Sequence, residues 1–129
     1  MNGLMAIAMA KTFGTPTDSI ARAIGSFNGI RRRFSYQIKT DELVYIDDYA
    51  HHPTEINAVH QAVSELYPGR KVLAIFQPHL FSRTKDFADG FAESLSAFDE
   101  VLLMDIYPAR ELPMEGVTSE WLLGKMTNS

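Results

Sequence analysis

Three clusters of ionisable side chains could carry chemistry, and each directly follows a short apolar segment. Residues 47–52 read Asp-Asp-Tyr-Ala-His-His, which combines two carboxylates, a phenol and two imidazoles. Residues 77–85 contain Arg83, whose guanidinium can hold a carboxylate through two parallel hydrogen bonds. Residues 105–111 end in an arginine beside a glutamate. Residues of these types suit a site for anionic ligands.

Each cluster also has a structural explanation. One of the two aspartates could tighten a turn, and His52 could cap a helix. Arg83 could be a solvated loop residue, and Arg110 could pair with Glu111 inside its own loop. The first cluster has five polar residues, more than a turn requires, which favours a functional role for it as a whole. For the third cluster the two explanations are equally good.

A metal site is the less favoured interpretation of the first cluster. Asp and His bind zinc and hard cations, but the rest of the chain offers only His60 and His79 as further imidazoles, without HExxH spacing. Neither GxxxxGK[ST] nor GxGxxG occurs, so this segment alone does not cradle nucleotide phosphates. Ser82 lies in no nucleophile-elbow motif, which argues against a serine hydrolase. We expect neither a catalytic nucleophile nor a metal ligand in this chain.

The first part of the chain predicts two short helices that form a hairpin. The first ends near Gly14 and has helical spacing at Leu4, Ile7, Ala8 and Lys11. Thr15-Pro16 begins the second, which should end near Gly29 and carries on one face Ile20, Ala23, Ile24 and Phe27.

Strands and helices then alternate. Residues 33–39 alternate apolar and polar side chains, Asp41-Glu42 makes a turn, and residues 43–46 form an apolar strand of the kind buried on both faces. Further strands are expected at 72–76 and 101–104. Helices are expected after each of the last three strands. The first should bury Ile56, Val59, Val63 and Leu66, and the second should bury Phe87, Phe91 and Leu95. The third should span about residues 119–126.

This order predicts an α/β, Rossmann-like fold with a mainly parallel sheet, right-handed crossovers and helices on both faces. Only three strands follow the first one, and the chain ends on a helix, so we expect a domain truncated at both ends. Ligands of open α/β sheets bind beyond the carboxyl ends of the strands. All three polar clusters fall at such ends.

The composition is that of one globular domain of 129 residues, with 46% hydrophobic and 22% charged residues. A net charge of −4 gives no general attraction for nucleic acid or membranes, and the arginine triplet at 31–33 is weak evidence by itself. The apolar residues 1–10 are too few to span a bilayer, and no cysteine is present. We expect a cytoplasmic protein.

Four motifs, in order, resemble those of the Mur ligases. They are Phe-Asn-Gly-Ile-Arg-Arg-Arg-Phe at 27–34, Tyr-Ile-Asp-Asp-Tyr-Ala-His-His-Pro-Thr-Glu at 45–55, Phe-Gln-Pro-His at 76–79 and Ser-Arg-Thr at 82–84. The loop at 105–111 matches as well, so the resemblance covers nearly the whole chain. It is strongest to those members that join L-alanine to UDP-N-acetylmuramate in peptidoglycan synthesis.

The resemblance implies a three-domain, ATP-dependent ligase that works through an acyl phosphate. Residues 1–27 resemble the terminal helices of the central ATPase domain, and residues 28–129 resemble an incomplete C-terminal domain. ATP and Mg²⁺ would be held mainly by the missing central domain, so the isolated chain should be inactive. Because the apolar face of residues 1–27 lacks its usual partner, the isolated chain should pack on itself or on another copy.

Residue roles follow from the same resemblance. The amino-acid substrate is assigned to Tyr49, His51 and Arg83, and the nucleotide to Arg33, Asp48 and His52. Many members carry a second arginine where this chain has Leu80, so the alanine carboxylate should depend on Arg83, with Lys85 or backbone groups assisting.

Three other functions fit parts of the sequence. A murein-tripeptide recycling ligase shares the His-His-Pro-Thr element at 51–54, although Tyr49 and Phe-Gln-Pro-His argue against it. A small metallophosphoesterase could use Asp47, Asp48, His51 and His52. A binding module without catalytic activity is the third.

Overall fold

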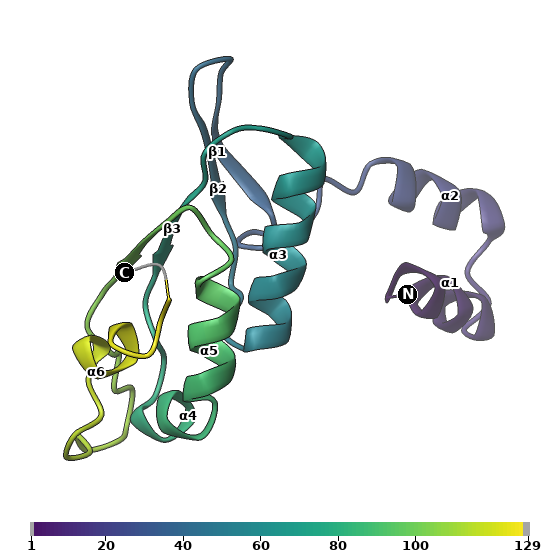
Figure 1. Ribbon diagram of the computed structural model, residues 1–129. Helices are drawn as coiled ribbons and strands as arrows, with labels where there is room; N and C mark the ends of the chain where they lie inside the picture. Colours follow the sequence, from purple (N-terminus) through teal and green to yellow (C-terminus); the bar gives the residue numbers. More distant parts are fainter. Residues whose placement is uncertain (1, 128–129) are drawn as a thin grey trace. The chain divides into compact units, whose positions relative to one another are not determined.

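The computed structural model describes residues 2–127, apart from the side chain of Asn2 (Figure 1). The chain divides into two compact units, Met1–Arg31 and Arg32–Ser129. The sequence-based domain boundary at 27/28 lies a few residues before this division.

The first unit is the expected helical hairpin, made of α1 (Asn2–Thr12) and α2 (Thr17–Gly25). Gly14 adopts a φ of 75°, a conformation that favours glycine, and reverses the chain between them. The second helix ends at Gly25, so the prediction that it runs to Gly29 was wrong. Gly25 and Ser26 are poor helix formers, and Ser26 closes the last turn by donating its backbone N–H to Arg22 O.

The second unit begins with an antiparallel hairpin of β1 (Ser35–Lys39) and β2 (Val44–Asp47). The predicted turn is confirmed, because Thr40 N–H donates to Leu43 O across it at 2.9 Å. Burial of β2 on both faces was a wrong prediction, since Tyr45 is 50% exposed.

The remaining elements are α3 (Pro53–Leu66), β3 (Leu73–Phe76), α4 (Phe81–Asp86), α5 (Ala88–Leu95), β4 (Glu100–Leu103) and α6 (Ser119–Leu123). The expected helix after β3 is two helices, with Phe87 between them. β3 and β4 pair in parallel, but β2 joins neither of them in the described residues. The predicted mainly parallel sheet is therefore two small sheets, one antiparallel and one parallel.

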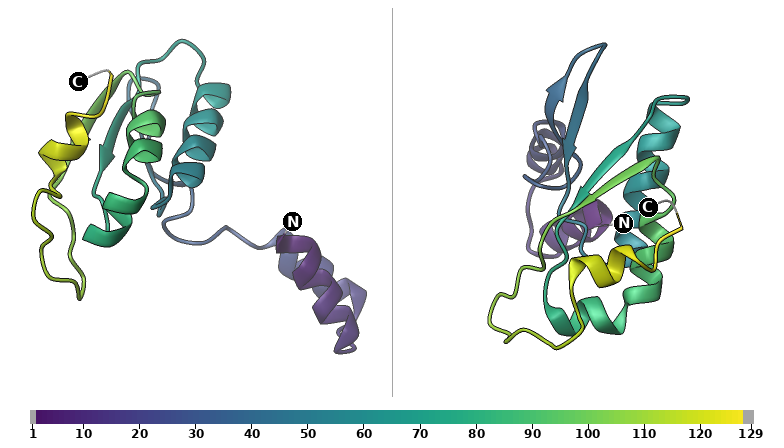
Figure 2. Two further views of the ribbon diagram at one scale, coloured as in Figure 1. Left: turned by 60° about the horizontal axis from the view of Figure 1, so that its bottom comes forward. Right: turned by 60° about the vertical axis from the view of Figure 1, so that its left-hand side comes forward.

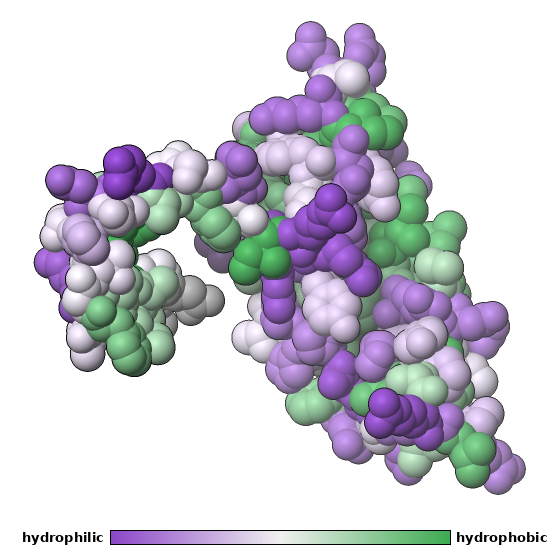
Figure 3. Space-filling model, turned by 180° about the vertical axis from the view of Figure 1, so that it is seen from behind, coloured by the Kyte–Doolittle hydropathy of each residue, from purple (hydrophilic) through white to green (hydrophobic). Residues whose placement is uncertain are grey.

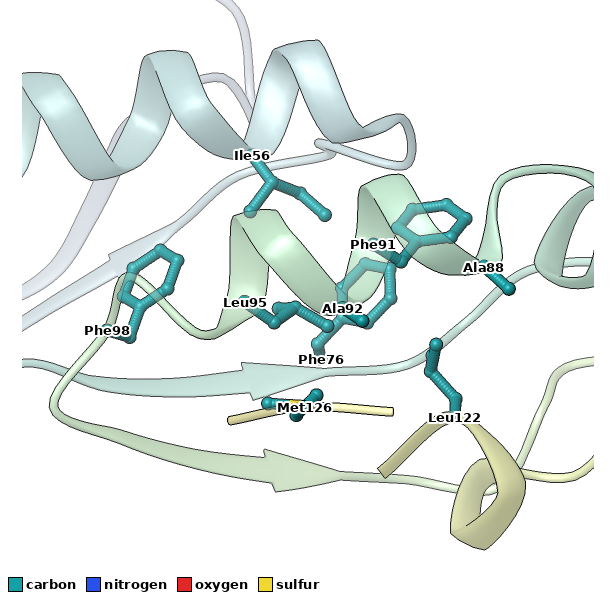
Figure 4. Close-up of a cluster of buried hydrophobic side chains, with 9 residues drawn as sticks. All are labelled: Ile56, Phe76, Ala88, Phe91, Ala92, Leu95, Phe98, Leu122 and Met126. Carbon is teal, nitrogen blue, oxygen red and sulfur yellow. The ribbon is translucent and has the colours of Figure 1, made fainter. Parts of the chain in front are cut away.

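One face of the β3–β4 sheet carries the core (Figure 4). The apolar side chains there come from α3, β3, α5 and the region of α6, and the core consists of Ile56, Phe76, Ala88, Phe91, Ala92, Leu95, Phe98, Leu122 and Met126. α3 and α5 lie side by side in both views of Figure 2. The segment after α6 runs along α5, because Lys125 Nζ lies 2.9 Å from Asp89 Oδ1 and Thr127 N–H donates to Ser96 Oγ.

The opposite face of this sheet is bare in the described residues. Most of its side chains are apolar and roughly half exposed: Leu73 53%, Ile75 61%, Leu102 50% and Met104 46%. Glu100, which pairs with Leu73, lies on the same face. The prediction of helices on both faces was therefore wrong for this part of the chain. The space-filling view in Figure 3 shows apolar side chains at the surface of both units.

Candidate functional site

The loop between β2 and α3 is fastened to the segment that precedes β1. Asp48 accepts hydrogen bonds from Phe34 N–H at 2.7 Å and from Ala50 N–H at 2.8 Å. Tyr49 N–H donates to Arg32 O at 2.8 Å. Arg32 and Phe34 have φ values of 58° and 48°, which cost energy in residues with a side chain. The hydrogen bonds of residues 48–50 hold this strained segment in place.

The guanidinium groups of Arg32 and Arg33 both lie close to the Tyr49 ring. The Arg32 guanidinium carbon lies 4.8 Å from the ring centroid and that of Arg33 lies 5.9 Å from it, within cation–π range. Arg33 also approaches Glu55 at 3.8 Å, and Arg32 approaches Asp47 at 3.9 Å. All four charged side chains are partly exposed, so their charges stay accessible to a ligand.

His51 is oriented by two acceptors. Its Nδ1 lies 2.9 Å from Tyr49 O and 3.3 Å from Glu55 Oε2. Since neither partner can donate, Nδ1 carries the proton, and in the neutral ring Nε2 has a free lone pair. Glu55 also accepts His51 N–H at 2.9 Å. This bond, more than the charges of His51 and Arg33, holds the pKa of Glu55 below its ordinary value.

His52 has the helix-capping role that its place in the sequence made possible. Its Nδ1 accepts Thr54 N–H at 3.3 Å and lies 2.6 Å from Thr54 Oγ1, so His52 caps α3. Its ring packs edge-on against Phe87, with 4.7 Å between the centroids. This contact connects the first loop to the end of α4.

The loops after β3 and β4 are joined by a short parallel bridge. Leu80 N–H donates to Tyr107 O at 2.9 Å, and Tyr107 N–H donates to Pro78 O at 2.8 Å. His79 stacks on the Tyr107 ring at 5.4 Å, and its buried Nδ1 has no hydrogen-bond partner within residues 2–127. Leu80 has a φ of 73°, so the site contains a further strained residue.

Glu111 ties the same two loops together at the start of α4. Its carboxylate accepts Ser82 N–H at 3.0 Å and the Ser82 hydroxyl. These two bonds, with smaller effects from Phe81 N–H and the charge of Arg83, lower the pKa of Glu111. The predicted alternative of a local Arg110–Glu111 pair is therefore wrong, because Glu111 bonds across to Ser82.

The predicted site residues fall into two groups. Arg33, Asp48, Tyr49 and His51 belong to one contact network around the β2–α3 loop, with His52 at its border. Arg83, which is half-buried, lies in α4, and the contact of Phe87 with His52 connects the end of this helix to the network.

Sequence reasoning missed two carboxylates. The role of Glu55 could have been predicted from the sequence, because a glutamate three residues after a helix cap often accepts a backbone N–H just before the helix. The role of Glu111 could not, because its partner Ser82 is 29 residues away.

Two features are absent from the described residues: a metal-binding cluster and a membrane-spanning helix. No group of three or more His, Asp or Glu side chains between residues 2 and 127 could hold a metal ion. In the same part of the chain, no helix is long and apolar enough to cross a bilayer.

The parallel β3–β4 pair, the helices on its core face and the polar loops beyond its strands define an α/β domain of the Rossmann type. The chain belongs to the Mur ligase family, since residues 32–128 match its glutamate ligase domain. The match begins at the residue where the second compact unit begins.

Curated relatives and solved structures agree with this membership. The chain is 89% identical over 99% of its length to a UDP-N-acetylmuramate–L-alanine ligase of Flavobacterium johnsoniae, and 73% identical over 98% to that of Flavobacterium psychrophilum. It spans 28% of the length of each relative.

Among solved structures, it resembles the UDP-N-acetylmuramate–alanine ligase of Thermotoga maritima, with a TM-score of 0.64 and 34% identity over 82% of this chain and 23% of that one. A murein peptide ligase of Psychrobacter arcticus gives a TM-score of 0.61 and 30% identity over 79% of this chain and 22% of that one.

Proposed function

We propose that this chain is part of an ATP-dependent ligase that joins L-alanine to UDP-N-acetylmuramate in peptidoglycan precursor synthesis. The observation that carries the proposal is 89% identity, over 99% of the chain, to a relative of that name. The strand-end loops support it, because they present guanidinium, imidazole and phenol groups suited to anionic substrates.

In the proposed reaction, a carboxylate oxygen of UDP-N-acetylmuramate attacks the γ-phosphorus of ATP and ADP leaves. The neutral amine of alanine then attacks the acyl carbon and gives up one proton, and the tetrahedral intermediate expels phosphate to leave an amide. Both substrates and ATP are anionic, so bringing them together requires positive charge on the protein.

Arg33 is assigned to the ATP phosphates. Its guanidinium lies between the Tyr49 ring and Glu55 in contacts that are weak because solvent screens them, so it can turn to a stronger anionic partner. Asp48 uses one lone pair of each oxygen for the backbone, which leaves capacity to accept a ribose hydroxyl. His52, which caps the N-terminus of α3, is the third residue assigned to the nucleotide in this proposal.

Alanine is assigned to Tyr49, His51 and Arg83. The free Nε2 lone pair of His51 can accept a hydrogen bond from the alanine amine, while the Arg83 guanidinium pairs with the carboxylate. Leu80 supplies no second charge at this point, so Arg83 is the main recognition group in the proposal.

The rest of the machinery is assigned to the longer polypeptide. The described residues contain no cluster that fits Mg²⁺, so we assign the metal and most ATP contacts to a central ATPase domain. We further propose that residues 1–27 are the terminal helices of that domain and that the enzyme is cytoplasmic, where ATP and nucleotide sugars are available.

The test is a competition between amine substrates. The full-length polypeptide receives ATP, Mg²⁺ and UDP-N-acetylmuramate with equal amounts of L-alanine and murein tripeptide, and products are separated by mass. We expect the L-alanine adduct to dominate. Dominance of the tripeptide adduct would support the second candidate, a murein peptide ligase, which is favoured by the similar fold of the Psychrobacter arcticus protein.

A further inference from the structure

The first turn of α4 lacks a cap of its own. The residue before it is Leu80, whose side chain has no oxygen to accept the free N–H groups at the helix start. Thr84 does not help, since its hydroxyl donates to Leu80 O at 2.8 Å. The backbone that carries Arg83 therefore needs an acceptor from elsewhere.

Glu111 supplies that acceptor from the loop after β4. One of its oxygens accepts Ser82 N–H at 3.0 Å, and the other accepts the Ser82 hydroxyl. A two-point, charge-assisted attachment fixes direction as well as distance. The residue so attached is the immediate neighbour of Arg83.

The loop that carries Glu111 is itself held against the β3–α4 loop. The Leu80–Tyr107 and Tyr107–Pro78 backbone bonds and the stacking of His79 on Tyr107 set the spacing between the two loops. Gln77 adds a side-chain bond to Asp105 O at 3.2 Å. These contacts fix the position of the loop from which Glu111 bonds to Ser82.

We propose that Glu111 is a positioning residue for Arg83: by capping α4 in place of Leu80, it fixes where the Arg83 guanidinium meets the substrate carboxylate. This inference rests on the proposed function, in which that carboxylate belongs to alanine. Glu111 lies in the loop after β4 and bonds to the start of α4. In this proposal it affects substrate binding through Arg83 and does not touch the substrate itself.

The test is a double-mutant cycle in the full-length enzyme, with KM for alanine and kcat measured for Arg83→Ala, Glu111→Ala and the double variant. Losing a buried charge pair costs about 2–5 kcal/mol. Arg83→Ala should therefore raise KM for alanine by roughly 30-fold to several thousand-fold. Arg83→Lys should rescue only part of this, because an ammonium cannot form the bidentate fork.

Glu111→Ala should raise KM for alanine by about 3- to 100-fold, because misplacement of a binding group by about 1 Å has effects of this size. KM for ATP and for UDP-N-acetylmuramate should stay within about twofold. In the Arg83→Ala background, Glu111→Ala should change KM for alanine by less than about twofold, because the group it positions is gone. Glu115→Ala, an exposed carboxylate of the same loop, is the matched control and should have no effect.

The outcomes separate the two proposals. If Arg83→Ala leaves KM for alanine unchanged, the assignment of Arg83 to the alanine carboxylate fails. If Arg83→Ala has its effect but Glu111→Ala has none, or has an equal effect in both backgrounds, the positioning role fails. A uniform loss of kcat without change in KM would likewise contradict it.

Discussion

At the scale of the residue, the site is organised by backbone groups as much as by side chains. Asp48, Glu55 and Glu111 each accept at least one backbone N–H, and each lies beside a residue assigned to a substrate. Carboxylates in this arrangement orient the neighbouring cations without neutralising them fully.

Arg33→Ala should impair the step that involves ATP. Removing one donor from a developing phosphate charge typically costs about 100- to 1,000-fold in kcat. KM for alanine should rise far less than kcat falls, because Arg33 bears on the alanine site through the Tyr49 ring and Glu55, whereas the alanine carboxylate is assigned to Arg83. Steady-state kinetics of the full-length enzyme measure both. Lys71→Ala, an exposed cation just before β3, serves as the control.

The Glu111–Ser82 pair should also make stability depend on pH. Because the folded state lowers the pKa of Glu111 from 4.5, its contribution is fully present above about pH 4.5 and is lost as the pH falls through the lowered value. Glu111→Gln should therefore be less stable than the wild type at pH 7, and the gap should narrow at pH 3. Urea unfolding at both values tests this, and a gap that widens in acid would refute it.

At the scale of the element, local patterns predicted most helices and strands within a few residues. Gly14, the Thr15-Pro16 start of α2 and the Asp41-Glu42 turn acted as expected, because each decides a backbone conformation locally. Local patterns could not show that β2 stays unpaired with β3, or that Phe87 divides the expected helix in two. Strand pairing and the break at Phe87 depend on tertiary contacts.

Local sequence patterns were limited in the same way for the candidate site, because they do not show tertiary contacts. The motifs led to the prediction that Tyr49, His51 and Arg33 are site residues, and in the structure these three side chains belong to one contact network. The positive φ of Leu80 and the bond between Glu111 and Ser82 could not be predicted, because both arise from loops brought together by β3 and β4.

Gly90→Val should separate α3 from α5. A Cβ at residue 90 would lie 3.0 Å from Pro53 Cγ, so a branched side chain must push the first turn of α3 away. Overpacking of this kind costs about 1–3 kcal/mol. Gly124→Ala, whose Cβ would lie 3.5 Å from Glu120 O, should stay within about 0.5 kcal/mol of the wild type. Equal urea midpoints for both variants would contradict the close packing.

At the scale of the whole molecule, apolar surface is left uncovered. The bare face of the β3–β4 sheet is largely apolar, α1 exposes Met5 and Met9, and Phe13 is exposed just after this helix. Surfaces of this kind favour association. Sedimentation velocity of the isolated chain should show a sedimentation coefficient that rises with concentration, and Ile75→Lys should reduce the rise. A strictly monomeric chain at millimolar concentration would contradict this prediction.

The proposed ligation transfers one carboxylate oxygen to phosphate, and an isotope label can follow that oxygen. The full-length enzyme is given ATP, L-alanine and UDP-N-acetylmuramate whose lactyl carboxylate is labelled with ¹⁸O. Ligation through an acyl phosphate predicts that one labelled oxygen appears in inorganic phosphate for each amide formed, and only when L-alanine is present. Unlabelled phosphate, label in AMP, or turnover without L-alanine would show that this enzyme does not ligate L-alanine through an acyl phosphate.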